Sequence, residues 1–74
     1  MRREVLTQLL QRDPCPILRL HISNGTVFEI LDPDLAVITR STVELLLSTD
    51  SGEQNEVVVN LLHIIWIEVL PPTV

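Results

Sequence analysis

Residues 17 to 31 read Ile-Leu-Arg-Leu-His-Ile-Ser-Asn-Gly-Thr-Val-Phe-Glu-Ile-Leu, two alternating apolar runs that meet at Asn24-Gly25. Alternation with a period of two on both sides of an Asn-Gly dipeptide predicts a β-hairpin. A two-residue loop would place Leu20 opposite Glu29 and mix core with solvent, whereas a three-residue loop, Ser23 to Gly25, keeps like residues opposite one another. The sequence therefore predicts the longer loop, with Gly25 in the left-handed conformation. The expected pairs are Leu20 with Phe28, Leu18 with Ile30, and Arg19 with Glu29.

Length and composition favour a single small domain, residues 1–74, that is stabilised by self-association. A chain of 74 residues buries a small core, so its stability is marginal without disulfides, metal or oligomerisation. Cys15 is the only cysteine, which excludes an intrachain disulfide and predicts a reduced, cytoplasmic setting. With His21 and His63 it shows no metal-ligand spacing, so we expect no metal. A hydrophobic content of 46% in so short a chain then favours a homo-oligomer.

The charge balance limits the possible partners. Ten acidic and five basic residues give a net charge of −5, which repels nucleic-acid phosphates unless a local basic patch exists. No apolar run approaches the roughly 18 residues of a membrane span, and none resembles a secretory signal. We therefore expect a soluble protein with no membrane partner.

A helix is predicted over residues 2–12, because Val5, Leu6, Leu9 and Leu10 form one apolar stripe. Asp13-Pro14 ends it. Cys15 then lies between two prolines in a stiff connector, and we interpret it as a packed residue rather than a reactive thiol.

The middle of the chain predicts a second hairpin. Asp32-Pro33-Asp34 is either a turn between two strands or a sharp bend in one long strand. Residues 35–39 and 42–49 then pair around Arg40-Ser41, which places Ile38 opposite Val43 and Ala36 opposite Leu45. Primed two-residue turns favour Gly, Asn or Asp, and Arg40-Ser41 has none of these, so a wider loop stays open as an alternative. Residues 50–55 are predicted to form an exposed loop.

Residues 56–70 are almost all apolar or β-branched, and fifteen residues would make an unusually long strand. We therefore predict a strand at 56–60, a tight turn near Asn60 to His63, and a last strand at 64–70. Pro71-Pro72 ends that strand, and residues 71–74 form a tail.

These elements predict a mainly β fold: an N-terminal helix followed by a closed or nearly closed small antiparallel barrel of five to six strands, SH3-like, over residues 17–70. Closure is how such small, curved sheets remove exposed edges. The expected core residues are mostly the inward-facing positions of the strands, with Phe28 at the centre. They are Leu18, Leu20, Phe28, Ile30, Ala36, Ile38, Val43, Leu45, Val57, Val59, Ile65 and Ile67.

The order of elements resembles the Sm-like fold and, within it, the bacterial Hfq-like branch. Asn24-Gly25 looks like the Asn-Gly of the first Sm motif, Asp34 like the aspartate before the third strand, and His63-Ile64 like the histidine-containing turn of the Hfq-like branch. Ile30 stands where the family has a glycine that bends its second strand, and Leu62 stands where it has a lysine. The resemblance implies assembly into a ring through the fourth and fifth strands, and RNA binding.

The candidate RNA-contacting residues are Asn24, Arg40 and His63. His63 lies in the predicted turn, where its ring either bonds backbone groups or, as the resemblance implies, contacts a nucleotide. Arg2, Arg3 and Arg12 belong to the predicted helix, where they form either a modest basic strip or an ordinary solvated helix face. His21 is predicted to be an outward-facing strand residue. No nucleophile motif and no phosphate-binding glycine loop is present, so we expect no catalytic residue, no enzyme activity, no cofactor and no small-molecule substrate.

The last strand carries large apolar residues on both faces. If Ile65, Ile67 and Val69 face the core, the opposite face carries Ile64, Trp66, Glu68 and Leu70. Such a face predicts an interface between copies, with Trp66 as its anchor. The candidate interface residues are Val58, Ile64, Trp66 and Leu70.

Two functions follow as hypotheses. The favoured one is a non-enzymatic, Sm-like, ring-forming homo-oligomer that binds RNA weakly. The alternative is a purely structural or assembly subunit, such as a phage-type accessory protein, that acts through protein contacts and has no nucleic-acid ligand.

Overall fold

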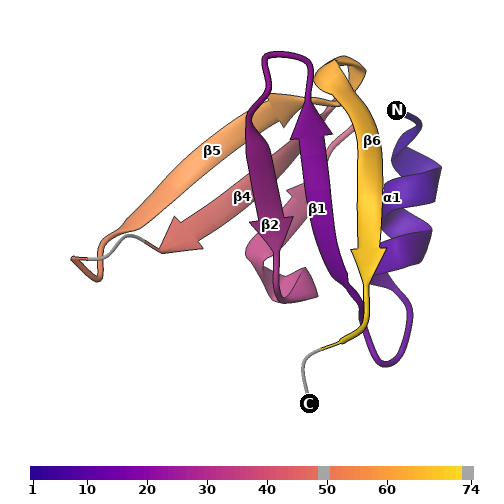
Figure 1. The fold of residues 1–74 in the computed structure, drawn as a ribbon, viewed down its shortest axis with the longest axis horizontal. Coiled ribbons are helices and arrows are strands. Elements are labelled where there is room, and N and C mark those ends of the chain that lie inside the picture. The colour runs from indigo at the N-terminus through magenta and orange to yellow at the C-terminus, as the bar shows by residue number, and fades with distance from the viewer. Residues whose placement is uncertain (49–50, 73–74) are drawn as a thin grey trace.

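The structure is a computed structural model that describes residues 1–48 and 51–72. One helix precedes six strands, which form two antiparallel sheets of three strands each, ordered β2-β1-β6 and β3-β4-β5 (Figure 1). The elements are α1 (Arg3–Leu10), β1 (Ile17–Ile22), β2 (Val27–Ile30), β3 (Ala36–Ile38), β4 (Thr42–Ser48), β5 (Gln54–Asn60) and β6 (Ile64–Leu70). Short 3-10 turns at Pro33–Leu35 and Leu61–His63 join β2 to β3 and β5 to β6.

The opening hairpin has the predicted register. Leu18 lies opposite Ile30, Arg19 opposite Glu29, and Leu20 opposite Phe28. The loop is closed by two backbone hydrogen bonds of 2.9 Å, from the Ile22 amide to the Thr26 carbonyl and from the Gly25 amide to the Ile22 carbonyl. Gly25 has φ of +89°, the left-handed conformation that the three-residue loop requires.

The second hairpin is also confirmed, with Ile38 opposite Val43 and Ala36 opposite Leu45. Arg40 and Ser41 form its two-residue link, and among the residues described only glycines have positive φ. The link is therefore not a primed turn. Instead, the Thr42 amide donates to Oγ1 of Thr39 over 3.0 Å, and the Thr39 amide donates to the Thr42 carbonyl over 2.9 Å. Threonine side chains thus supply the hydrogen bonds that the turn residues do not.

The prediction of a mainly β fold with an N-terminal helix is confirmed, but the described residues form two three-stranded sheets rather than one closed barrel, because β2 and β3 belong to different sheets. The 3-10 turn at Pro33–Leu35 separates them, which settles whether this segment divides two strands or bends one. Oδ1 of Asp32 accepts from the Asp34 amide over 2.9 Å and fixes the turn. With Ile30 in place of a glycine and no amide hydrogen on Pro33, the backbone turns instead of continuing one bent strand.

Element boundaries differ from the predictions at three places. Strand β3 covers Ala36–Ile38 rather than 35–39, because Leu35 belongs to the preceding 3-10 turn. The helix is shorter than predicted, beginning at Arg3 and ending at Leu10 rather than covering 2–12. Strand β5 begins at Gln54, so Gln54 and Asn55 pair with β4 and do not belong to the predicted loop. Thr49 and Asp50, which were assigned to the second hairpin and to that loop, lie outside the described residues.

The core lies between the two sheets and the helix. Leu6, Leu18, Leu20 and Val43 are fully buried. The other core residues are Leu9, Ile22, Ile30, Leu45, Val59, Leu61 and Ile64. Leu6 and Leu9 of α1 belong to this cluster together with residues of both sheets, so the helix packs against the core that the sheets share. Phe28, expected at the centre, is only partly buried and packs against this cluster.

The prediction that Ile65 lies in the core is wrong, and a β-bulge is the reason. His21 lies opposite Trp66 but the next residue, Ile22, lies opposite Ile64, so the register shifts by one residue at Ile65. The bulge brings Ile64 into the core and leaves Ile65 with 64% of its surface exposed.

Within the described ranges, no helix is long and apolar enough to cross a lipid bilayer.

Leu20→Ala tests the core assignment, with Val27→Ala as the matched control from the same hairpin. Leu20 is fully buried, so its truncation should lower the free energy of unfolding by about 2 to 5 kcal/mol. Truncation of the half-exposed Val27 should lower it by less than about 1 kcal/mol. Chemical denaturation of both variants measures this difference. Equal midpoints for the two variants would show that the leucines of β1 are not the centre of the core.

Candidate functional site

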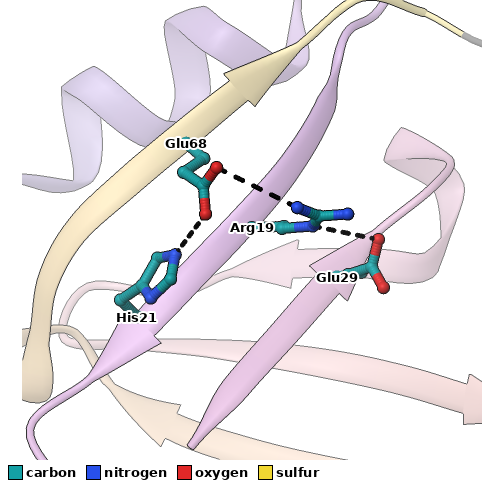
Figure 2. A network of polar contacts seen from close by, with 4 residues as sticks. All are labelled: Arg19, His21, Glu29 and Glu68. Carbon is teal, nitrogen blue, oxygen red and sulfur yellow. Dashed lines mark hydrogen bonds and ion pairs between the residues drawn. The ribbon is translucent and has the colours of Figure 1, made fainter. Parts of the chain in front are cut away.

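A polar network covers the outer face of the β2-β1-β6 sheet (Figure 2). Because side chains alternate along β1, Arg19 and His21 point away from the core while Leu18 and Leu20 point into it. Arg19 lies between two carboxylates, 3.5 Å from Glu29 on β2 and 3.9 Å from Glu68 on β6. The network therefore ties all three strands together on the solvent side.

The His21 imidazole makes a polar contact through Nε2 and a stacking contact through its ring face. Its Nε2 lies 2.7 Å from Oε1 of Glu68, which is within hydrogen-bond distance. The imidazole stacks in parallel on the Trp66 indole, with ring centroids 3.6 Å apart and an interplanar angle of 7°. Both contacts of His21 join β1 to β6, so the cluster links these two strands on the solvent side.

His63 and Asn24, two of the predicted RNA contacts, line the same groove of about 360 Å³. The Ser23 amide donates to the His63 carbonyl over 2.8 Å, and Oγ of Ser23 lies 3.3 Å from Nδ1 of His63. These bonds hold the Leu61–His63 turn against the first hairpin. Phe28, Val57 and Val59 supply apolar lining, so the groove offers an aromatic and aliphatic wall beside an exposed imidazole.

Arg40, the third predicted RNA contact, lies in a neighbouring groove of about 370 Å³ with Arg2 and Arg3. Three of the five arginines of the chain line this groove together with one carboxylate, Glu4, whose Oε1 lies 3.8 Å from Nε of Arg3. The N-terminal amine is fixed beside them, because it donates to the Leu61 carbonyl over 3.2 Å. Asn60 lines both this groove and the His63 groove, so the two hollows adjoin.

The predicted basic strip of Arg2, Arg3 and Arg12 does not form as a unit. Arg2 is the N-cap of α1 and Arg3 its first residue, but Arg12 lies beyond the other end of this eight-residue helix. Arg40 replaces Arg12 in the basic cluster, because the β3–β4 turn and the start of α1 line the same groove. Chain position alone could not show this proximity.

The four predicted interface residues differ in exposure. Val58 is 57% exposed and Trp66 49% exposed, whereas Leu70 is partly buried. Ile64 is only 4% exposed, so it offers no surface to another molecule in this fold. The bulge puts Ile65 on the surface in its place.

Cys15 is partly buried in the connector after the helix. Desolvation raises the pKa of its thiol, and the nearby negative charge of Asp32 raises it further. A thiol with a raised pKa is protonated at neutral pH and is a poor nucleophile. The interpretation of Cys15 as a packed residue agrees with this environment.

Sequence reasoning missed the stacking of His21 on Trp66 and the bonding of His21 to Glu68. The alternation of β1 and β6 placed each residue on an outward face, but the sequence contained no signal that β6 pairs with β1.

Comparison of the chain with protein-family models, curated proteins and solved structures finds no match.

Proposed function

We propose that the protein is a non-enzymatic, Sm-like homo-oligomeric module of the cytoplasm that assembles into a ring through the edges of β5 and β6 and contacts RNA weakly. The observation that carries the proposal is the pair of strand edges. Strand β5 pairs only with β4, and β6 pairs only with β1, so each of these seven-residue strands has one side without a strand partner in the described residues.

The strand order supports the Sm-like reading. If β2 and β3 together correspond to the bent second strand of that family, then β5 and β6 correspond to its fourth and fifth strands. An unpaired edge is a template for pairing with another chain. When β5 of one copy pairs with β6 of the next, the contact is heterologous and closes into a ring at a suitable rotation.

Exposed apolar side chains on both strands support the same assembly. Val58 on β5 and Ile65 and Trp66 on β6 are each about half exposed or more. The indole has one ring face against His21, which fixes its orientation before any partner binds. A large, preoriented aromatic side chain is the kind of group that dominates interface energies.

The two adjoining grooves support a contact with single-stranded RNA. Arg2, Arg3 and Arg40 offer guanidinium groups to phosphates, and His63 and Phe28 offer ring surfaces to bases. The net charge of −5 opposes the approach of a polyanion, so the contact is expected to be weak. The same excess of acid favours the alternative of a structural or assembly subunit with no nucleic-acid ligand.

Ile65→Glu and Trp66→Glu should dissociate the assembly, because each places a charge at the β6 surface that a partner would bury. Leu62→Glu is the matched control, since Leu62 is 83% exposed in the turn before β6. Sedimentation velocity should show smaller species for both β6 variants and no change for the control. Trp66→Glu also removes the His21 stack, so circular dichroism must confirm that its fold persists. Unchanged sedimentation of folded Ile65→Glu would contradict an interface at β6.

RNA binding should be weak and salt-dependent, and should require the arginine groove. Anisotropy titrations with uridine-rich and adenine-rich oligonucleotides should show no submicromolar affinity at about 150 mM salt and tighter binding at lower salt. Arg3→Gln with Arg40→Gln should abolish the low-salt binding, whereas Arg12→Gln should weaken it only slightly. No binding at low salt would leave the structural-subunit function, and submicromolar binding at about 150 mM salt would contradict the weak contact.

A further inference from the structure

The outer face of the β3-β4-β5 sheet combines exposed apolar side chains with carboxylates. Across the sheet, Val37 lies opposite Glu44, and Glu44 lies opposite Val58. In the next outward-facing row, Leu46 lies opposite Glu56. Acidic and apolar groups therefore alternate in both rows of this face, where a solvated sheet would carry mainly polar residues.

The carboxylates of this face have no cation beside them. No salt bridge to Asp34, Glu44 or Glu56 occurs in the described part of the chain, whereas Glu29 and Glu68 on the other sheet share Arg19. The arginines lie elsewhere: Arg2, Arg3 and Arg40 line the groove at the start of α1. The fold thus separates basic and acidic surfaces.

A hollow of about 190 Å³ lies among these groups. Leu35, Val37 and Leu46 contribute apolar walls, and Asp34, Glu44 and Glu56 contribute carboxylates. A cavity of about 150 Å³ holds a benzene ring, so this hollow is large enough for the end of one long side chain. An arginine or lysine suits such a site, because its methylene stem packs on apolar groups while its charged end meets carboxylates.

We propose that this face, defined by Val37, Glu44, Leu46 and Glu56, binds a basic segment of a partner protein in which two cationic side chains lie two residues apart between apolar ones. Charge complementarity selects this occupant, since the face offers unpaired carboxylates and no cation. Glu44 and Glu56 are diagonal neighbours on adjacent strands, a separation of about 7 to 8 Å. Alternate residues of an extended chain are spaced by about 6.6 Å, which matches that separation.

The face borders the surface of the proposed ring, because Val58 on β5 lies opposite Glu44 and is also a candidate ring contact. Ring assembly would pair the backbone edges of β5 and β6, whereas the basic segment would contact side chains that stand out from the sheet around β4. The inference therefore does not rest on the proposed function, and either can fail without the other.

The test uses a labelled peptide with the sequence Leu-Ser-Arg-Ser-Arg-Ser-Leu, blocked at both ends, and fluorescence anisotropy. The variant Glu44→Gln with Glu56→Gln should bind it at least about tenfold more weakly than the wild type, because both charge-assisted contacts are lost. The control variant, Glu4→Gln with Asp13→Asn, changes the net charge equally on the helix and connector and should bind within about twofold of wild type. A peptide with both leucines replaced by serine should also bind more weakly than the parent.

Three results would overturn the proposal. Equal weakening in the two double variants would show attraction by net charge alone. Absence of saturable binding up to about 1 mM peptide would show that the face does not take a basic segment. Loss of wild-type self-association in the Glu44→Gln, Glu56→Gln variant would show that a second copy of the chain occupies the face.

Discussion

The two-sided pairing of β1 is the constraint on which the structure depends. β1 pairs with β2 on one side and β6 on the other, although β6 follows it by more than forty residues. Its leucines at 18 and 20 are fully buried, while Arg19 and His21, which alternate with them, bond to both neighbouring strands on the outer face. A slip of one residue would bury the charges and expose the leucines, so the core and the outer network fix the same register.

Much of the fold could be predicted from the sequence, because the decisive signals are local. Alternation of apolar residues around Asn24-Gly25 was enough to choose the loop length and the register of the first hairpin. The same alternation on either side of Arg40-Ser41 was enough for the second. Features that depend on distant pairing could not be predicted. The bulge at Ile65 arises from the pairing of β6 with β1, and a run of apolar residues at 64–67 has no internal signal for which of them is displaced. The sheet does not close into one barrel in the described residues, because the turn at Pro33–Leu35 separates β2 from β3, and the sequence left open whether this segment divides two strands or bends one.

The candidate site shows the same division. Sequence reasoning chose Asn24 and His63, and the fold places both at one groove because their two turns are bonded together. It also chose Arg40, but grouped the helix arginines incorrectly, since only Arg2 and Arg3 lie near the β3–β4 turn. The fold thereby sorts a chain of net charge −5 into surfaces of different character. One is a basic groove at the start of the helix, one is an ion-paired sheet face, and one is an acidic and apolar sheet face. The proposed RNA contact and the proposed docking of a basic segment would use different parts of this surface.

The proposed self-association would cover the edges of β5 and β6, which have no strand partner on one side within the described residues, and would stabilise a small chain. Light scattering coupled to size-exclusion chromatography measures the mass of the wild-type protein at micromolar concentration without any substitution. We predict a single species whose mass is a multiple of the 8.4 kDa chain. A monodisperse species of 8.4 kDa would contradict the ring and, with it, the Sm-like function.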